Sequence, residues 1–253
     1  MKRAMQSRLS DLLAFDRSMV RPLSAVRKTG SSRSSGQAPS SPAIGGDKPV
    51  LDQLLNLPGP ARQLAVIGID EVGRGCLAGP VVAAAVTLPV IEPGSELTHQ
   101  LNMLNDSKVL AAREREELSE VLLRVASCSI AEASVQEIDQ INILQASLLA
   151  MRRARLNLQV VSPVVVLVDG NKKIPKLADR QITVVKGDSL SAAIAAASVI
   201  AKVYRDRLMS RLSEQFPDYL WHQNKGYGSP AHRAAIKRLG LTAWHRKSFS
   251  LST

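Results

Sequence analysis

The sequence predicts an α/β protein in which a mixed central sheet is flanked by helices. Short runs of β-branched and other apolar residues alternate along the chain with longer segments of helical periodicity. The run at 164–168 holds five consecutive apolar residues, as expected for a central strand covered on both faces. Two of these runs end in an aspartate, at Asp70 and Asp169. The pattern therefore indicates a sheet with acidic side chains at the ends of its strands.

The folded body is expected to start near residue 64 and to open with two strands joined by a glycine-rich turn. Apolar residues spaced for one helix face follow, and then two further short strands. The last long helix begins with a segment of almost only alanine and serine, small residues that allow close approach to a sheet. The expected strands are 65–69, 81–88, 164–168 and 182–185, and the expected helices are 113–125, 138–156 and 190–212.

The N-terminal part differs in composition from the rest. We expect residues 1–62 to form a basic, serine-rich, disordered extension and residues 63–253 to form the folded domain, because 25–50 is too poor in apolar residues to pack. The first twenty residues place apolar side chains at about helical spacing among basic ones, as in an organelle-targeting helix, although Asp11 and Asp16 are unusual in one. The expected location is the cytoplasm, with an organelle as the alternative.

The charge balance indicates a polyanionic partner. The chain has 253 residues with 33 Lys and Arg against 22 Asp and Glu, a net charge of +11, which points first to nucleic acid. No apolar run reaches the roughly 18 residues of a membrane span, so we expect a soluble protein without a membrane partner. Its two cysteines, Cys76 and Cys128, do not make a disulfide framework and favour a reducing compartment.

Carboxylates follow three of the expected elements, as Asp70 with Glu71, Asp169 and Asp188. If the first strand and 164–168 are parallel neighbours, Asp70 and Asp169 meet at one edge of the sheet, where ligand sites gather in open α/β sheets. Crowded carboxylates repel one another and need cations. Oxygen ligands favour Mg²⁺ or Mn²⁺, and a pair of such ions can stabilise the attacking and leaving oxygens of a phosphodiester.

Each acidic residue also has a structural interpretation. Asp188 precedes a helix, where aspartate is a common N-cap. Asp169 is followed by Gly170, a pair typical of a turn. Asp70 and Glu71 could lie in a solvated loop. Considered singly, capping and turn formation are the commoner roles for Asp188 and Asp169.

Six sequence blocks between about residues 64 and 250 resemble, in order, those of the type 2 ribonuclease H family, whose bacterial form is ribonuclease HII. The first runs from Gly68 through Gly75 to Pro80. Arg74 between two glycines, together with the low-complexity extension, is similar to ribonuclease HII rather than to ribonuclease HIII. The chain departs from the family pattern at Cys76, Val109 and Asn224. The remaining blocks are 105–108, 168–171, 186–206, 225–228 and 245–249.

The resemblance implies a ribonuclease H-like fold with a helical C-terminal part, in a monomer that carries the catalytic domain in residues 63–253. It implies a metal-dependent endonuclease that cleaves the RNA strand of RNA–DNA hybrids and single ribonucleotides embedded in duplex DNA, leaving 5′-phosphate and 3′-hydroxyl ends. It also implies two Mg²⁺ or Mn²⁺ ions in the substrate complex. The catalytic and metal-binding residues would be Asp70, Glu71, Asp169 and Asp188.

The resemblance further implies how the substrate is bound. A glycine-arginine-glycine loop would read the ribose 2′-hydroxyl at an RNA–DNA junction, and a tyrosine would pack on the following deoxyribose. A contact with a replication clamp cannot be derived from these residues. The substrate-binding residues would be Gly73, Arg74, Gly75, Tyr227, Lys108 and Lys202.

Several residues and functions have alternatives. We expect His245 to be a surface histidine that contacts phosphate or water, and Trp221, Trp244 and Phe249 to serve packing. The carboxylates alone would also suit a DNA junction resolvase or integrase-type nuclease, which would not need the glycine-arginine-glycine loop or Tyr227. From a different class, the basic chain could be an RNA-binding protein without catalysis.

Overall fold

The computed structural model describes residues 2–20, 64–92, 94–106, 110–160 and 163–250. Its centre is a mixed five-stranded sheet in the order β3-β2-β1-β4-β5. Strand β1 pairs antiparallel with β2 on one side and parallel with β4 on the other, which confirms the predicted mixed sheet. The strands are β1 (Ala65–Val72), β2 (Val81–Thr87), β3 (Ser127–Ala133), β4 (Val164–Asp169) and β5 (Arg180–Val184).

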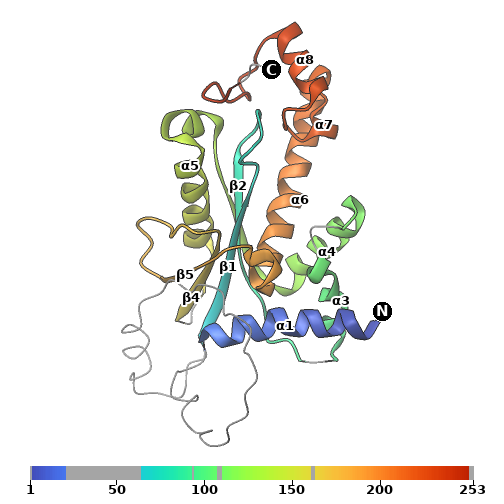
Figure 1. Ribbon diagram of the computed structural model, residues 1–253, viewed down its shortest axis with the longest axis vertical. Coiled ribbons are helices and arrows are strands. Elements are labelled where there is room, and N and C mark those ends of the chain that lie inside the picture. Colours follow the sequence, from blue (N-terminus) through green and yellow to red (C-terminus); the bar gives the residue numbers. More distant parts are fainter. Residues whose placement is uncertain (1, 21–63, 93, 107–109, 161–162, 251–253) are drawn as a thin grey trace, which may run out of the picture.

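Helices cover both faces of this sheet, with α5 on one face and α6 on the other (Figure 1). Asn142 interrupts α5 with a positive φ of 66°. No helix among the described residues is both long and apolar enough to cross a membrane. The helices are α1 (Lys2–Val20), α3 (Glu96–Leu101), α4 (Ala112–Val125), α5 (Val135–Asn157), α6 (Ala192–Gln215), α7 (Trp221–Asn224) and α8 (Pro230–Leu239), with the short 3₁₀ helices η2 (Asn102–Asp106), η3 (Gly187–Ser189) and η4 (Pro217–Tyr219).

Strand β2 explains the two-sided core. Its alternate residues enter different clusters, Ala83 and its odd-numbered neighbours on the α5 side and Ala84 and its even-numbered neighbours on the α6 side. Both faces are therefore buried, which is why the strand reads as a continuous apolar run. The strand β3 was not predicted, because its sequence mixes serine and glutamate with small apolar residues. Pairing with β2 along its whole length makes it a strand.

Close packing of α6 on β1 sets the position of the sheet edge. A Cβ atom added to Gly68 would lie 2.1 Å from the backbone carbon of Ala193. Only glycine therefore allows α6 to approach β1 this closely. The alanines at the start of α6 are buried, as the small-residue pattern predicted.

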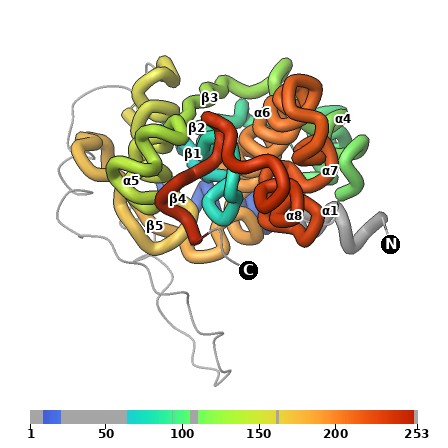
Figure 2. The backbone as a smooth tube through the Cα atoms, turned by 90° about the horizontal axis from the view of Figure 1, so that it is seen from above, coloured from blue at the N-terminus to red at the C-terminus, as the bar shows by residue number. Residues whose placement is uncertain are grey.

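The C-terminal part is helical, as the family resemblance implied. Trp221 is completely buried and stacks on Tyr219 with ring centroids 5.4 Å apart, which confirms its packing role. After α8 the chain crosses the end of the sheet toward α5 (Figure 2). There the backbone N–H groups of Lys247 and Ser248 donate hydrogen bonds to Asp139 of α5.

The structure differs from the expected disordered extension at Lys2–Val20, which form α1. Leu9 and Leu12 are buried, and Leu9 belongs to the same core cluster as β2 and α6. The buried Asp16 accepts a hydrogen bond from the backbone N–H of Ala193, in the first turn of α6, at 3.0 Å. The helical spacing thus reflects packing onto the domain. Residues 21–63 of the expected extension lie outside the described residues.

Candidate active site

The sheet brings the first two predicted acids together at one edge. Ile69 and Val168 are the last paired residues of the parallel strands β1 and β4, and Asp70 and Asp169 follow them directly. Asp70 is only 7% exposed. The predicted juxtaposition of these two side chains is therefore present, and it results from the parallel pairing.

The turn before α6 carries another predicted acid, Asp188, toward the same place. The carboxylate Oδ1 of Asp169 accepts a hydrogen bond from the backbone N–H of Gly187 at 2.6 Å. A Cβ atom on Gly187 would lie 2.5 Å from Cδ1 of Ile194 and 3.1 Å from that carboxylate oxygen. Glycine thus lets the turn that carries Asp188 lie against Asp169. Asp188 itself is buried.

The alternative structural roles of these acids can be compared with the observed geometry. Ser191, not Asp188, is the N-cap of α6, because its hydroxyl accepts the backbone N–H of Ile194 at 3.1 Å. A turn does follow Asp169, where Gly170 has φ of +93° and donates its N–H to Val184. The carboxylate of Asp169 is directed to Gly187, outside that turn contact.

The electrostatics show a cluster of acids whose burial and mutual repulsion are only partly offset by neighbouring groups. Burial raises the pKa of Asp70 well above its ordinary value, and repulsion from Glu71 and Asp169 raises it further. The Ser198 hydroxyl and the N–H of Glu71 partly oppose this by hydrogen bonding to Asp70. Burial also raises the pKa of Glu71, although Arg74 opposes the change from 3.1 Å. A bound cation would relieve this repulsion.

A cavity of about 190 Å³ opens beside these acids and contains Glu71 and Asp188 in its wall. Lys202 and Ser198 of α6 and Arg115 of α4 complete its polar lining. Lys202 pairs with Asp206 at 2.7 Å while it lines the same cavity as Glu71 and Asp188. The other predicted lysine, Lys108, lies outside the described residues.

The donor atoms of the four acids fit a hard divalent cation, since all are carboxylate oxygens. Glu71, however, is bound to Arg74. In the described part of the chain, no three Asp, Glu, His or Cys side chains are arranged closely enough to form a metal site. The residues therefore supply the right ligand chemistry, in an arrangement that is not closed around an ion.

The glycine-rich loop at 73–80 is held by a buried arginine from α6. Arg205 is completely buried and donates hydrogen bonds to the carbonyls of Ala78 at 2.9 Å and Pro80 at 3.1 Å. Gly73 has φ of +96°, and an added Cβ atom would lie 2.3 Å from Nε of Arg205. Only glycine fits this position.

A second buried arginine holds the same loop from the C-terminal segment. Arg246 donates to the carbonyl of Gly79 through Nε at 3.0 Å and Nη2 at 2.8 Å, and to the carbonyl of Arg74 through Nη1 at 2.9 Å. Burial lowers its pKa to about 10. Phe249 packs under the guanidinium at 5.1 Å, in line with its predicted packing role.

Sequence reasoning missed both arginines as site supports. A signal existed for Arg205, which continues the buried i, i+4 stripe of Ala201 and Met209 along α6. A charged residue in such a stripe must find buried partners. No comparable periodicity surrounds Arg246.

Tyr227 lies beside the glycine-arginine-glycine loop. It forms an isolated antiparallel bridge with Cys76, and a Cβ atom on Gly75 would lie 3.9 Å from Cε1 of its ring. The ring side chain remains 45% exposed. The structure therefore brings Tyr227 next to Gly75, while their roles toward a substrate remain a prediction.

His245 is not the surface histidine that was expected, because it is only 1% exposed. Its Nε2 lies 3.2 Å from Nε2 of His232, which also accepts the indole N–H of Trp221 at 3.0 Å. Nδ1 of His232 contacts the carbonyl of Tyr227 at 2.8 Å. Burial, and then repulsion from His232, lower the pKa of His245 to about 4. This neutral pair supports the segment that carries Tyr227.

Comparisons with known proteins agree with this architecture. The family model described as Ribonuclease HII matches residues 67–252. A ribonuclease HII of Delftia acidovorans is 54% identical over 186 residues, covering 73% of this chain and 75% of that protein. One of Albidiferax ferrireducens is 50% identical over 185 residues, covering 73% and 85%.

Solved structures show the same fold. The ribonuclease HII in a complex with PCNA from Archaeoglobus fulgidus is 28% identical with a TM-score of 0.58, covering 75% of this chain and 97% of that one. A Bst ribonuclease HIII solved with Mn²⁺ has a TM-score of 0.60 at 18% identity, covering 74% and 68%. The chain therefore belongs to the ribonuclease HII family and is an endoribonuclease of the ribonuclease H type.

Proposed function

We propose that the enzyme cleaves the RNA strand of RNA–DNA hybrids and also single ribonucleotides embedded in duplex DNA, leaving 5′-phosphate and 3′-hydroxyl ends. One observation carries the proposal. Asp70 and Glu71 run directly into the glycine-rich loop, which is bridged to Tyr227 at Cys76 and is held by two buried arginines. Chemistry and sugar recognition are thus built on adjoining elements.

Asp70, Glu71, Asp169 and Asp188 would hold divalent cations, Mg²⁺ or Mn²⁺. Bound there as a pair, such ions would supply an activated water and stabilise the charge that develops on the phosphodiester oxygens. The Mn²⁺ complex of the ribonuclease HIII neighbour supports this choice of metal. The pKa values of Asp70 and Glu71 are raised because the neighbouring protein groups do not fully offset the burial and repulsion of these negative charges.

Recognition of RNA requires more than the acids, because RNA and DNA share the same phosphodiester. The distinguishing atom is the 2′-oxygen, which both donates and accepts hydrogen bonds. Gly75 is exposed, so its backbone is open to a sugar, and the exposed Arg74 lies between it and the buried Gly73. A site built to bond a hydroxyl rejects a substrate that lacks it, because the polar groups of the site stay unpaired.

Tyr227 would place its exposed ring on the deoxyribose that follows the ribonucleotide, where an additional hydroxyl fits poorly. Lys202, in the wall of the cavity, would contact a phosphate near the scissile bond. Lys108 would contribute another phosphate contact. These contacts select an RNA–DNA junction rather than RNA in general.

The experiment compares two labelled duplexes, one with a single ribonucleotide in DNA and one with a continuous RNA strand opposite DNA. We expect the wild-type enzyme to cut both with Mg²⁺ or Mn²⁺ and neither with EDTA. The Tyr227→Ala variant should lose much more activity on the single ribonucleotide than on continuous RNA, whereas Gly73→Val should lose activity on both. Equal losses for Tyr227→Ala would remove this residue from junction recognition.

The same assay separates the alternative functions. Cleavage of branched all-DNA substrates, with no preference for a ribonucleotide, would indicate a junction nuclease. Duplex binding that is unchanged by EDTA, without any cleavage in Mg²⁺ or Mn²⁺, would indicate a nucleic-acid-binding protein instead of an enzyme.

A further inference from the structure

A second cavity, of about 380 Å³, lies between α4 and α6 and carries an excess of positive charge. Four of its lining side chains are cationic, Arg115 from α4, Arg207 and Arg211 from α6, and Lys225 from the segment before Tyr227. Its acidic lining residues are Glu116 and Asp206. A concave surface with this balance suits an anion.

This cavity adjoins the smaller one beside the catalytic acids, and we call the two together the groove. Ser198, Val199 and Lys202 line the catalytic end, and Asp206, Arg207 and Arg211 line the other, all along one side of α6. Arg115 lines both cavities. The rise of an α-helix places Arg211 about 14 Å beyond Lys202, a distance that spans several nucleotide steps. One rigid helix therefore connects the two ends.

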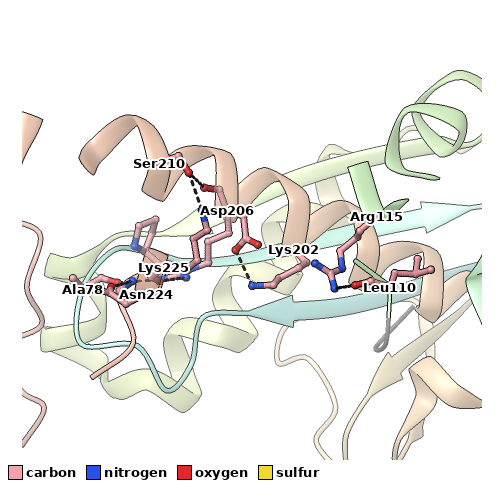
Figure 3. A network of polar contacts seen from close by, with 11 residues as sticks. Ala78, Leu110, Arg115, Lys202, Asp206, Ser210, Asn224 and Lys225 are labelled. Atoms are coloured by element: carbon pink, nitrogen blue, oxygen red, sulfur yellow. Dashed lines mark hydrogen bonds and ion pairs between the residues drawn. The ribbon is translucent and has the colours of Figure 1, made fainter. Parts of the chain in front are cut away.

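Of the acids that line this cavity, Asp206 is already paired, while the cations keep hydrogen-bond donors. Asp206 pairs with Lys202 at 2.7 Å, and Lys225 donates to Ser210 at 2.8 Å (Figure 3). Arg115 spends one N–H on the carbonyl of Leu110 at 2.7 Å, as the same view shows. A guanidinium has five N–H donors, so most of those on Arg115 remain for a ligand.

The two arginines of α6 are weakly engaged. Arg207 meets Glu120 at 3.6 Å and Glu116 at 4.0 Å, with all three side chains largely exposed, and such pairs contribute little. Within the described ranges, no carboxylate oxygen lies within 4.0 Å of Arg211. Both guanidinium groups are therefore available to an oxyanion, which they can bind in a bidentate manner.

We infer that this cavity binds a backbone phosphate of the nucleic-acid substrate, several nucleotides away from the bond that is cut. The inference rests on the proposed function, because it takes the duplex to occupy the groove at the catalytic acids. A duplex is favoured over an acidic peptide because the cavity is part of that groove and because Lys225 lies two residues from Tyr227. The phosphate could belong to the cut strand or to its complement, and both have the same chemistry.

The test measures binding and cleavage in parallel, with Arg207→Ala, Arg211→Ala and the control Arg113→Ala. Arg113 lies on α4 near Arg115, but its side chain is highly exposed, pairs with Glu117 and does not line the cavity. Binding of an unmodified labelled duplex in EDTA is followed as a function of salt concentration. Each of the two α6 variants should bind about tenfold more weakly. The slope of log binding constant against log salt concentration should become shallower by about one, as expected for the loss of one phosphate contact. The control should match the wild type.

A substrate series then locates the phosphate. Single neutral methylphosphonates are placed one at a time along either strand, and KM is measured for each duplex. One position should raise KM for the wild type and cause little further loss in Arg211→Ala, and its strand identifies the source of the phosphate. If both α6 variants keep the affinity and salt dependence of Arg113→Ala, the inference is wrong. If the wild type binds as expected but cuts nothing, the proposed function fails while the binding data still decide this inference.

Discussion

The catalytic edge and the glycine-rich loop beside it satisfy their polar groups in opposite ways. At the edge, buried carboxylates repel one another and the pKa of Asp70 is raised well above its ordinary value. In the loop, the carbonyls of Gly79 and Ala78 each accept hydrogen bonds from a buried arginine. The side chain of Arg205 also fills the space beside Gly73 where another residue would have its Cβ atom. Carboxylates whose charge is not offset mark where a ligand belongs. Backbone carbonyls whose hydrogen bonds are all made mark the scaffold that positions the ligand.

The largest effect on stability is expected when the hydrogen bonds from Arg246 to the loop are removed. Arg246→Met keeps much of the side-chain volume but removes the donors to Gly79 and Arg74, so these carbonyls lose their buried partners. We expect the free energy of unfolding to fall by about 4 kcal/mol, measured by chemical denaturation. Arg238→Met, which breaks only an exposed pair with Asp218, should change it by no more than about 0.5 kcal/mol. Equal effects would contradict the scaffold role of Arg246.

The catalytic edge should respond in the opposite sense. Asp70→Asn keeps the shape but removes one charge, so cleavage should fall by at least about 10²-fold. The stability of the metal-free protein should stay the same or rise, because repulsion is relieved. Asp218→Asn serves as the control for both measurements. Near-normal cleavage by Asp70→Asn would remove it from the catalytic centre.

The pair of His232 and His245 tests how protonation of a buried histidine affects the stability of the scaffold. The pKa of His245 is about 4 in the folded protein, against an ordinary value of 6.5. The unfolded chain therefore binds more protons between these values, and stability should fall as the pH drops through this window. We expect His245 to contribute about 2 kcal/mol of this loss between pH 7 and pH 5. His245→Gln should lack that contribution, while His99→Gln, at an exposed position, should retain it.

A smaller effect is expected at Asp16, a buried carboxylate without neighbouring acids. Burial raises its pKa to about 6, so the folded protein binds more protons than the unfolded chain between about pH 4 and 6, and stability falls as the pH rises through that range. Asp16→Asn should therefore be more stable than the wild type at pH 8, by about 1 kcal/mol, and similar to it at pH 4. The gain is limited because the Oδ1 position of Asp16 has no hydrogen-bond partner for an amide nitrogen. A loss of stability at pH 8 would show that the favourable interaction of the Asp16 charge with the start of α6 exceeds the cost of burying that charge.

The N-terminal helix also changes what truncation should do. The sequence alone predicted that residues 63–253 form the folded domain, so that a protein beginning near Gln63 would fold and cut normally. Because α1 buries Leu9 and its Asp16 accepts a hydrogen bond from the first turn of α6, we expect that shortened protein to retain cleavage but to unfold at a lower temperature. A melting temperature equal to that of the full chain would show that α1 contributes nothing to the fold.

By itself, the sequence determined four of the five strands, the long helices and the acids at the strand ends. These follow from local patterns, since a strand covered on both faces must be apolar throughout and an acid just beyond it must lie at the sheet edge. The meeting of Asp70 and Asp169 rested on the assumption that β1 and β4 are parallel neighbours, and the structure has this pairing.

Tertiary structure alone decided three other features. Ser127–Ala133 is a strand because β2 offers it an edge, and Lys2–Val20 packs as a helix because the core and the start of α6 present a matching surface. Arg246 supports the catalytic loop through carbonyls 167 and 172 residues away in the chain. Backbone carbonyls are the same in every residue, so no sequence pattern shows which of them a distant arginine will bind; only the folded chain brings donor and acceptor together.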